Sequence, residues 1–498
     1  MKKLLLISAA TLIVSNSTFA GGILTNTNQH AAFLRMLSRG ATTEIDGALS
    51  NPAGLAFLPK DGFHVGLSIQ SAYQTRNIDA SFMTYNGVSA TGPTVADKPF
   101  EKYYEGTAAA PVIPSLFAAY KKDKWTISGF FAITAGGGKA SFDDGLPMFE
   151  SAAMAGIFQN SVKAHQANPQ SPIIVPGMYD ITSAMDGKQY IYSLQLGLSY
   201  KATEWLSVFG GGRMNYFTGG YKGFLNAIVK GTDTNLLPLA LNCDQTGWGL
   251  TPVIGADVKL GKLNIGAKYE FKTNLNIENN TKNLQYPPSA KDMVAPYEHG
   301  VNTPNDIPAM LSIAAAYEFL PVLRASVEYH FYDDKNAGMA NGKQKYLTKG
   351  TNEYLAGIEF DVTKQLTLSC GGQITDYGLS DNYQSDTSFS CDSYSLGVGA
   401  KIKMNKHLNL NVGYMWTNYE DYTKKSTNYN GTGLPGTNVY SRTNKVFGLS
   451  ADYRFLIPVY EIKKKAIPKQ LRYGFFFTKN SKETDNLSAA PATVSTTG

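Results

Sequence analysis

Hydrophobic and polar residues alternate along most of the chain from Gly62 onward. The alternating segments are about 10–16 residues long, and a membrane strand needs roughly 9–11 residues, so each segment is long enough to cross a bilayer. Short turns or long polar loops separate the segments. The pattern predicts fourteen strands, at 62–76, 112–121, 124–140, 189–201, 204–218, 247–260, 262–275, 308–319, 322–333, 353–362, 365–378, 392–404, 407–420 and 443–455.

The lengths of the connections favour one architecture. Bacterial outer-membrane barrels have an even number of antiparallel strands, short periplasmic turns and long outer loops. The sequence therefore predicts an all-β fold, a transmembrane antiparallel β-barrel of 14 strands over residues 62–455. Tight turns are expected at 122–123, 202–203, 261, 320–321, 363–364 and 405–406, and long loops at 141–188, 219–246 and 276–307.

The two faces of each segment differ in the way that a membrane barrel requires. In segment 322–333, Leu323 and Val327 lie on one face, and Arg324 and Glu328 lie on the other. A charge near the bilayer midplane costs roughly 2–4 kcal/mol, so we expect the apolar face to contact lipid. An aromatic girdle is expected at the turn ends, from Tyr120, Tyr200, Phe319, Phe360, Tyr453 and Phe455.

Composition excludes two other classes of protein. After Val14 no apolar stretch approaches the roughly 20 residues that a membrane helix needs, so a helical membrane protein is excluded. The net charge of +6 is too small for a protein that binds nucleic acid through its phosphates. Charged residues make up only 17% of the chain, below the roughly 25% of soluble proteins, which agrees with a membrane barrel.

The first residues have the features of a secretory signal peptide. Lys2 and Lys3 precede a short apolar run over 4–14, and Thr18-Phe19-Ala20 forms a small-residue cleavage site. We therefore expect residues 1–20 to direct export, and we expect the protein to reside in the outer membrane of a bacterial cell.

Two further segments lie outside the alternating pattern. Residues 21–61 have a helix-like apolar spacing and are the right size for a plug, or hatch, inside the barrel lumen. Residues 456–498 become rich in Ser, Thr and Ala, and we expect a partly disordered periplasmic tail.

Several short motifs resemble the FadL/TodX-type family, the outer-membrane transporters of long-chain fatty acids and aromatic hydrocarbons. The resemblance covers about residues 24–455. It depends on Asn28-Gln29, Arg39-Gly40-Ala41, Asp46-Gly47-Ala48, Asn51-Pro52-Ala53, Ile113-Pro114-Ser115-Leu116, Asp306-Ile307-Pro308 and Val446-Phe447-Gly448-Leu449.

The resemblance implies a fourteen-stranded barrel with a hatch, in which Asn51, Pro52 and Ala53 form the hatch motif. It also implies passive uptake of hydrophobic compounds without any cofactor. The ligand would leave sideways, through an opening in the wall where the third strand kinks. The expected partners are a hydrophobic small molecule, outer-membrane lipid and lipopolysaccharide, with no nucleic acid, and the protein is expected to be a monomer.

A run of three glycines lies in the predicted third strand. Gly136, Gly137 and Gly138 remove side-chain packing and permit a bulge or a bend there. The alternative is an ordinary loop that begins early. If the strand does kink, we expect it to bend inward beside Asn51-Pro52-Ala53.

Candidate ligand-binding residues follow from the direction in which each side chain points along its predicted strand. By strand phase, Arg213, Lys268 and Arg324 point inward and are candidates to bind an acid group. The alternative is an internal ion-pair network with Asp257, Glu270, Glu328 and Glu359. An outer hydrophobic groove could be formed by the aromatic residues Phe217, Tyr221 and Phe224. The alternative is that these residues form the packed core of a loop.

Two other functions were weighed. A general or substrate-specific porin for small polar solutes needs a water-filled lumen, which segment 21–61 opposes. An outer-membrane lipid hydrolase needs a nucleophile, a base and an orienting group together. His330 faces the lumen near Asp333 and Asp334, but no serine motif accompanies it. We therefore expect no enzyme activity, no catalytic residue and no metal site.

The three cysteines do not suggest a disulfide framework. Cys370 and Cys391 are in phase with opposite faces of the sheet, so a bridge between them would need a bulge. Unpaired thiols are favoured, with a disulfide as the alternative.

Overall fold

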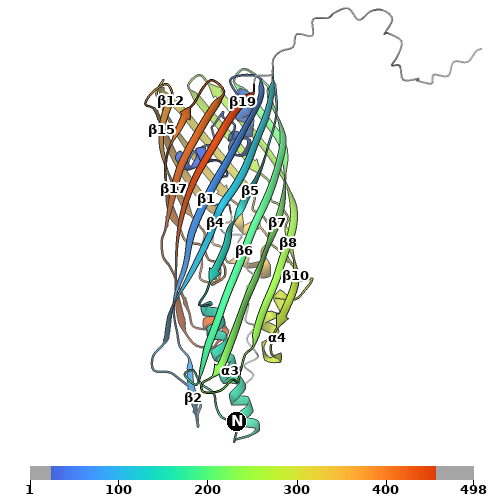
Figure 1. Cartoon of the computed structure of the whole chain (residues 1–498), viewed down its shortest axis with the longest axis vertical. Coiled ribbons are helices and arrows are strands. Elements are labelled where there is room, and N and C mark those ends of the chain that lie inside the picture. Colours follow the sequence, from blue (N-terminus) through green and yellow to red (C-terminus); the bar gives the residue numbers. More distant parts are fainter. Residues whose placement is uncertain (1–23, 456–498) are drawn as a thin grey trace, which may run out of the picture. The chain divides into compact units, whose positions relative to one another are not determined.

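The computed structural model describes residues 24–455. Within this part of the chain, 14 strands form a closed antiparallel barrel, which confirms the predicted fold class (Figure 1). The first strand pairs with both the second and the last, so the sheet closes on itself. The wall strands are β1 (Gly62–Phe82), β4 (Phe100–Lys122), β5 (Trp125–Phe142), β6 (Tyr179–Lys201), β7 (Leu206–Val229), β8 (Leu239–Leu260), β9 (Leu263–Glu270), β12 (Met310–Leu320), β13 (Leu323–Tyr332), β14 (Thr351–Asp361), β15 (Leu366–Asp376), β16 (Ser393–Lys403), β17 (Leu408–Tyr419) and β19 (Gly436–Phe455).

Several wall strands are longer than the sequence pattern predicted. β1, β4, β6, β7, β8 and β19 each have 20–24 residues. A bilayer needs roughly 9–11, so these strands continue far beyond it on the loop side. Lipid no longer contacts the outer face there, which is why the apolar alternation fades. Short strands extend this region: β10 (Asn276–Gln285), β11 (Asn302–Pro304) and β18 (Tyr422–Ser426), with β2 (Tyr85–Ser89) and β3 (Gly92–Val95) as a separate hairpin.

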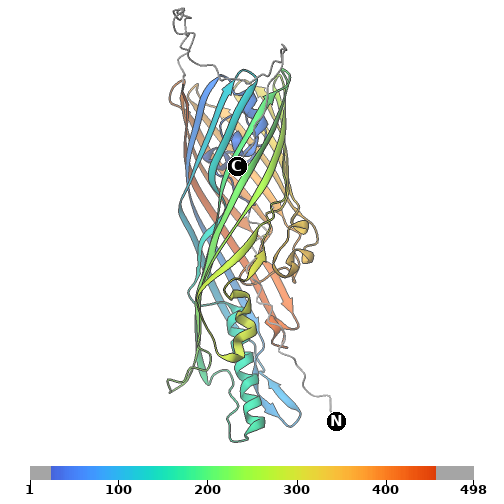
Figure 2. The same ribbon diagram turned by 90° about the vertical axis from the view of Figure 1, so that its right-hand side faces the viewer.

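The predicted loop 141–188 contains a helix that the sequence analysis missed. Helix α3 (Pro147–Ala167) lies at the loop end and packs on the outer ends of β6 and β7 (Figure 2). Its Glu150 accepts hydrogen bonds from Lys102 Nζ at 2.5 Å and Tyr104 Oη at 2.9 Å, which attach the helix to β4. No helix in residues 24–455 has the length and apolar character needed to cross a bilayer. Short helical turns in the loops are α4 (Lys291–Val294), η2 (Pro288–Ala290), η3 (Ala295–Tyr297), η4 (Asp334–Asn336), η5 (Ala340–Tyr346) and η6 (Tyr429–Gly431).

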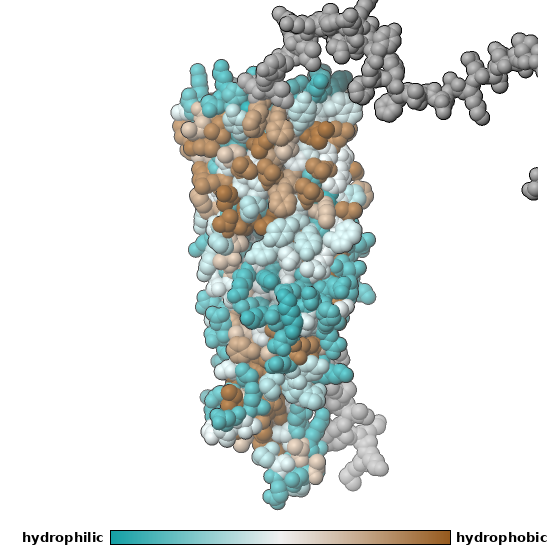
Figure 3. All heavy atoms as spheres, turned by 45° about the vertical axis from the view of Figure 1, so that its right-hand side comes forward, coloured by the Kyte–Doolittle hydropathy of each residue, from teal (hydrophilic) through white to brown (hydrophobic). Residues whose placement is uncertain are grey.

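The outer face of the barrel carries a broad apolar band near the turn end (Figure 3). Val327 of β13 and Val398 of β16 point outward and are 58% and 53% exposed, whereas the inward Glu328 is buried. The face assignment is therefore confirmed. Five of the six predicted girdle aromatics have exposed rings, namely Tyr120, Phe319, Phe360, Tyr453 and Phe455, and Tyr200 packs against Trp125.

Residues 24–61, here called the hatch, lie inside the turn end of the barrel (Figures 1 and 2). The hatch contains α1 (Ala31–Arg35), α2 (Gly47–Ser50) and η1 (Pro52–Phe57). Apolar hatch residues pack on inward residues of the wall, in one cluster with Phe117 and Phe130 and in another with Met415. The lumen at this level is therefore filled with protein.

The predictions for the two chain ends and for the cysteines have different outcomes. The predicted signal peptide and the predicted tail lie outside the described residues. Cys243, Cys370 and Cys391 are unpaired in the structure, and Cys391 lies in the loop after β15 instead of opposite Cys370.

The lipid-facing band generates the first prediction. Val398→Arg should lower the free energy of unfolding by about 2–4 kcal/mol, because it places a charge near the bilayer midplane. Unfolding by guanidinium in lipid vesicles measures this loss. Tyr103→Arg is the control, since Tyr103 is exposed on the long outer part of β4 and should tolerate a charge. An equal effect of both substitutions would contradict the placement of the band.

Candidate functional site

The Asn51-Pro52-Ala53 motif joins the hatch to the wall. Asn51 Nδ2 donates to Thr42 O at 3.0 Å and to Asp257 Oδ2 at 2.5 Å, and the Gly54 amide donates to Asn51 Oδ1 at 3.3 Å. Asparagine is a preferred helix cap, and proline suits the first helical turn because its missing N–H is not needed there. The motif therefore starts η1 and anchors it to β8.

The wall strands also hold the carbonyl groups of this motif. Ser199 Oγ of β6 donates to Pro52 O at 2.7 Å, and Ser207 Oγ of β7 donates to Ala53 O at 2.7 Å. Buried backbone groups are costly when they lack partners, so these two serines help to fix the hatch in one position.

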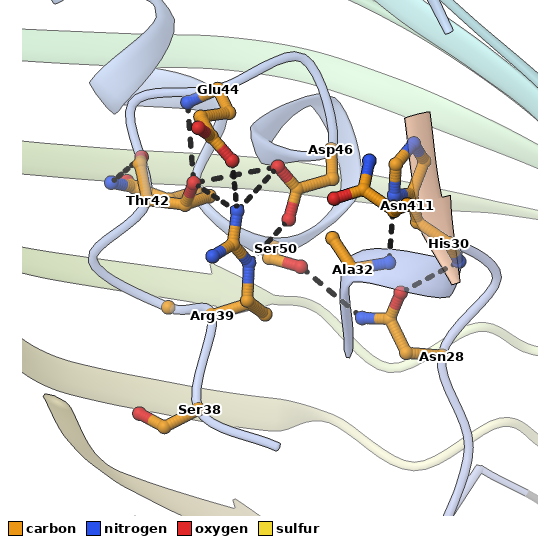
Figure 4. Close-up of polar contacts among 12 residues, drawn as sticks. Asn28, His30, Ala32, Ser38, Arg39, Thr42, Glu44, Asp46, Ser50 and Asn411 are labelled. Atoms are coloured by element: carbon orange, nitrogen blue, oxygen red, sulfur yellow. Dashed lines mark hydrogen bonds and ion pairs between the residues drawn. The ribbon is translucent and has the colours of Figure 1, made fainter. Parts of the chain in front are cut away.

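An ionic cluster stabilises the middle of the hatch (Figure 4). Arg39 donates to both oxygens of Asp46, at 2.7 and 2.9 Å, and to Glu44 at 2.9 Å. Lys401 of β16 lies 2.6 Å from Glu44, so the cluster extends to the wall. Buried charges require such partners, and removal of one partner typically costs about 3–5 kcal/mol.

A second hatch cation, Arg35, points into the wall. Its Nε donates to Asn411 Oδ1 at 2.9 Å, and its guanidinium forms an ion pair with Glu359. The sequence analysis did not identify Arg35 or Arg39 as charge partners of the wall. The available signal was two arginines in a segment predicted to fill the lumen, next to wall strands predicted to carry inward carboxylates.

The three inward cations predicted to bind a ligand are all engaged in ion pairs. Arg213 donates to both oxygens of Glu270, at 2.9 and 2.7 Å, and Lys268 lies 2.8 Å from the same carboxylate. Arg324 binds Asp361 through two hydrogen bonds, of 2.9 and 2.8 Å. These contacts favour the alternative of an internal network, with Asp361 as an additional partner.

Two of the predicted network acids, Asp257 and Glu328, accept hydrogen bonds from uncharged donors. Asp257 accepts from the amides of Asn51 and Asn264. Glu328 accepts from the backbone N–H groups of Arg39 and Gly40, at 2.7 and 2.8 Å, and thus fixes the turn of the hatch.

A catalytic role for His330 would need Asp333 or Asp334 beside its ring. In the structure its neighbours are instead Glu328, at 2.6 Å from Nε2, and Glu353, at 2.9 Å from Nδ1. Within residues 24–455, no three His, Cys, Asp or Glu side chains are grouped in a way that could hold a metal ion.

A large cavity lies between the hatch and the outer loops. The cavity and its open mouth together span about 1440 Å³, which includes solvent space at the opening. Its walls come from β1, β4, β5, β6 and β19, its floor includes hatch residues 25–27 and 29, and loop residues 387–389 contribute from the other side. The apolar lining residues are Ala72, Ala108, Ala110, Ile113, Ile133, Ala135, Ala140, Phe142, Leu146, Met185, Phe389 and Val446.

The loop that contributes residues 387–389 is fixed by one buried carboxylate. Asp386 accepts from the Met148 amide of α3, from Asn438 Nδ2 and from Tyr440 Oη, each at 2.8 Å. Burial raises the pKa of the Asp386 carboxyl, although Lys424 and these donors oppose the shift. Asp386 therefore joins α3, the loop and β19 over the cavity.

The three aromatic candidates lie in different places. Tyr221 lines the large cavity. Phe217 of β7 is buried in a separate apolar cluster with Ala135 and Ile191. Phe224 is 43% exposed and lines a separate apolar pocket of about 460 Å³ together with residues of α3 and β8. The proposed single groove of these three residues is therefore not formed.

The barrel wall is interrupted beside the large cavity. β4 and β5 pair from Lys122 and Trp125 up to Ser115 and Ala132, and pairing resumes only at Ala109 and Lys139. Residues 110–114 and 133–138 face each other without a ladder. The register of β5 against β6 also shifts twice over this stretch.

The glycine run lies within this interruption. Gly136 and Gly138 have φ values of +118° and +75°, which side chains other than glycine rarely adopt. A Cβ on Gly136 would lie 2.1 Å from Gln189 O. β5 continues beyond the run to Phe142, so the run is inside the strand and is not an early loop.

Two prolines complete the interruption, and the sequence analysis did not recognise their role. Pro111 and Pro114 lie on β4 opposite the glycine run. Proline has no N–H to donate to a ladder, so proline within a membrane strand is itself a signal of broken pairing.

The hatch residue that contacts the interruption is Gln29, and not the Asn51-Pro52-Ala53 motif that we expected there. Gln29 Nε2 donates to Thr134 O at 3.3 Å, and Ser115 Oγ donates to Gln29 O at 2.5 Å. The expectation that Asn51-Pro52-Ala53 lies beside the glycine run is wrong. That motif is bound to β6, β7 and β8, nearer the turns.

The hatch contacts generate a second prediction. Asn51→Ala should loosen the hatch, because it removes the buried amide that joins Thr42 and Asp257, at a cost of about 1–3 kcal/mol. Single-channel conductance should rise above that of the wild-type protein. Asn274→Ala, at an exposed position between β9 and β10, is the control. Unchanged conductance and stability of Asn51→Ala would mean that the motif is only a spacer.

Comparisons with known proteins agree with this architecture. Residues 292–455 match a family model described as an outer membrane protein beta-barrel domain. A FadL homologue from Pseudomonas aeruginosa is 16% identical, with a TM-score of 0.59, over 88% of this chain and 100% of that chain. The toluene transporter TodX from Pseudomonas putida is 13% identical, with a TM-score of 0.53, over 87% and 100%. A comparison with curated proteins found no match. The chain is therefore an outer-membrane β-barrel with the fold of the FadL/TodX-type transporters.

Proposed function

We propose that this protein takes up hydrophobic compounds across the outer membrane by passive diffusion. The ligand enters the large cavity from the loop side and leaves sideways, between β4 and β5, into the membrane. The observation that carries the proposal is the interrupted β4–β5 ladder beside that cavity. Long-chain fatty acids and aromatic hydrocarbons are the substrate classes considered, and no cofactor is required.

The physical chemistry of the wall supports a sideways path. Unpaired backbone in hydrocarbon is tolerated only where it lines a cavity or is covered by protein. Ala110, Ile113, Gly136 and Gly138 are all on the cavity lining, so the gap joins the cavity to the lipid side of the wall. An apolar ligand gains by entering lipid directly, since it avoids exposure to periplasmic water.

The hatch opposes a straight path through the barrel. Arg35, Arg39 and Asn51 bind wall side chains from the hatch, and apolar hatch residues fill the space between them. A porin for small polar solutes needs an open lumen at this level. Of the similar solved structures, the one from Pseudomonas putida is described as a toluene transporter, which supports a transport function.

A variant with a closed gap provides the third prediction. Replacing Pro111 and Pro114 with Thr, and Gly136 and Gly138 with Val, restores ladder donors and removes the left-handed positions. Uptake of radiolabelled hexadecanoate and toluene by cells should fall at least tenfold. Because four changes strain β5, a second variant, Ala110→Trp, narrows the gap without changing the backbone.

Matched controls use the same residue types in the outer loops. Gly177 has a positive φ with nothing near its Cβ position, and Pro238 precedes β8, so Gly177→Val with Pro238→Thr should leave uptake unchanged. Heat-modifiable gel mobility shows that each variant is folded. Wild-type uptake in both folded gap variants would mean that the ligand leaves by another path.

A further inference from the structure

A histidine lies between two buried carboxylates beside the hatch. The Nε2 atom of His330 is 2.6 Å from Glu328 Oε1, and its Nδ1 atom is 2.9 Å from Glu353 Oε2 on the neighbouring strand β14. The side chains of the two acids are only 4% and 3% exposed. A neutral imidazole has one N–H and one bare lone pair, and here the lone pair would face a carboxylate. The two contacts together therefore require a ring that is protonated at both nitrogens.

Among the residues that the structure describes, His330 is the only cation that forms an ion pair with either acid. Other charged or titratable side chains from the hatch, β7, β9 and β13 line the same part of the lumen. They are Arg39, Arg213, Lys268, Glu270 and Tyr332. The three cations among them have carboxylate partners of their own, because Glu270 binds two of them and Asp46 binds the third. Two buried negative charges therefore depend on one imidazolium for compensation.

Glu328 binds the hatch at its central turn. Its Oε2 atom accepts hydrogen bonds from the Arg39 and Gly40 amides, at 2.7 and 2.8 Å. A Cβ atom at Gly40 would overlap with the Glu328 carboxylate and with Ala314, so the glycine lets the turn approach the wall this closely. The position of the turn therefore follows the position of this carboxylate.

Glu353 binds the hatch at a second place, near its beginning. Its Oε1 atom accepts a hydrogen bond from the Asn26 amide at 2.9 Å, and Tyr332 Oη donates to its other oxygen at 3.0 Å. Residues 25–27 form part of the floor of the large cavity. One imidazole ring therefore joins the floor of the cavity to the middle of the hatch, through two glutamates.

We propose that His330 is a proton-dependent latch of the hatch. While both ring nitrogens carry a proton, the ring holds Glu328 on the central turn and Glu353 on the Asn26 amide. Loss of one proton leaves a single N–H between two carboxylates, so one acid loses its cation and the hatch backbone that it holds loosens. The hatch is therefore tight near neutral pH and looser in alkaline solution. This inference concerns the hatch alone and does not depend on which compound is transported.

The pH dependence of single-channel conductance tests the latch. Purified full-length protein is inserted into planar bilayers, and the pH is raised from about 6.5 to about 10, a range in which carboxylates stay ionised and imidazolium groups lose a proton. Wild-type conductance should rise roughly tenfold, because a hatch that has lost a buried ion pair admits ions. His330→Gln, which cannot carry a charge, should conduct at the high level at every pH.

A second variant shifts the response instead of abolishing it. Glu353→Gln leaves the ring with one carboxylate, so the second proton is held less tightly and conductance should rise at a pH about one unit below that of wild type. His64→Gln is the matched control, because His64 is also a buried histidine of the wall but bonds to Lys60 O and to no acid. It should keep the wild-type response to pH.

Hydrogen exchange at neutral pH reports on the latch without any ion flow. The amides of Asn26 and Gly40 should exchange at least tenfold faster in His330→Gln than in wild type. Exchange of the Ala48 amide, which donates to Ile45 O within the hatch, should not change. Heat-modifiable gel mobility shows that each variant is folded.

Three results would contradict the latch and leave the proposal of hydrophobic uptake standing. The first is a wild-type conductance that stays constant over the pH range. The second is a response to pH that survives in folded His330→Gln, which would place the titrating group elsewhere in the lumen. The third is unchanged exchange of the Asn26 and Gly40 amides in that variant.

Discussion

The need to pair every backbone hydrogen-bonding group in hydrocarbon determines most of this structure. A β-sheet satisfies that need in a bilayer only when it closes, and β1 closes it by pairing with both β4 and β19. The same requirement makes the interruption between β4 and β5 informative, because unpaired backbone persists there only beside a cavity and hatch residues. The interruption is encoded in the sequence, because β4 carries two prolines there and β5 carries two glycines with positive φ.

Closure of the barrel also creates an interior, where apolar side chains need packing partners and buried charges need partners of opposite sign. Near the turns, the hatch supplies apolar packing and places Arg35 and Arg39 against acids of the wall. Nearer the loops, the lining is apolar except for amides, hydroxyls and cations. The lumen thus has a turn-side part filled by the hatch and its ion pairs, and a loop-side cavity with a mostly apolar lining.

Lipid determined which features the sequence could predict. Where bilayer contacts one face of a strand, the alternation is strong, and each of the fourteen predicted segments overlaps one of the fourteen wall strands. Beyond the bilayer, water contacts the outer face, so the long outer parts of β4 and β7 and helix α3 left no comparable pattern. Strand phase showed that Arg213, Lys268 and Arg324 face inward. It could not show their partners, which depend on strand register and on the hatch.

The pairing of β1 with β19 has a consequence for biogenesis. Arg76 of β1 and Arg442 of β19 both line the large cavity, lie more than 360 positions apart in the chain, and meet only when those strands pair. Contacts of such large sequence separation form late, because a long loop must close first. An incompletely assembled barrel therefore lacks this half of the cavity, and any compound that binds there stabilises the finished barrel alone. Ligand occupancy would thus report, for a cell or an experimenter, that insertion is complete.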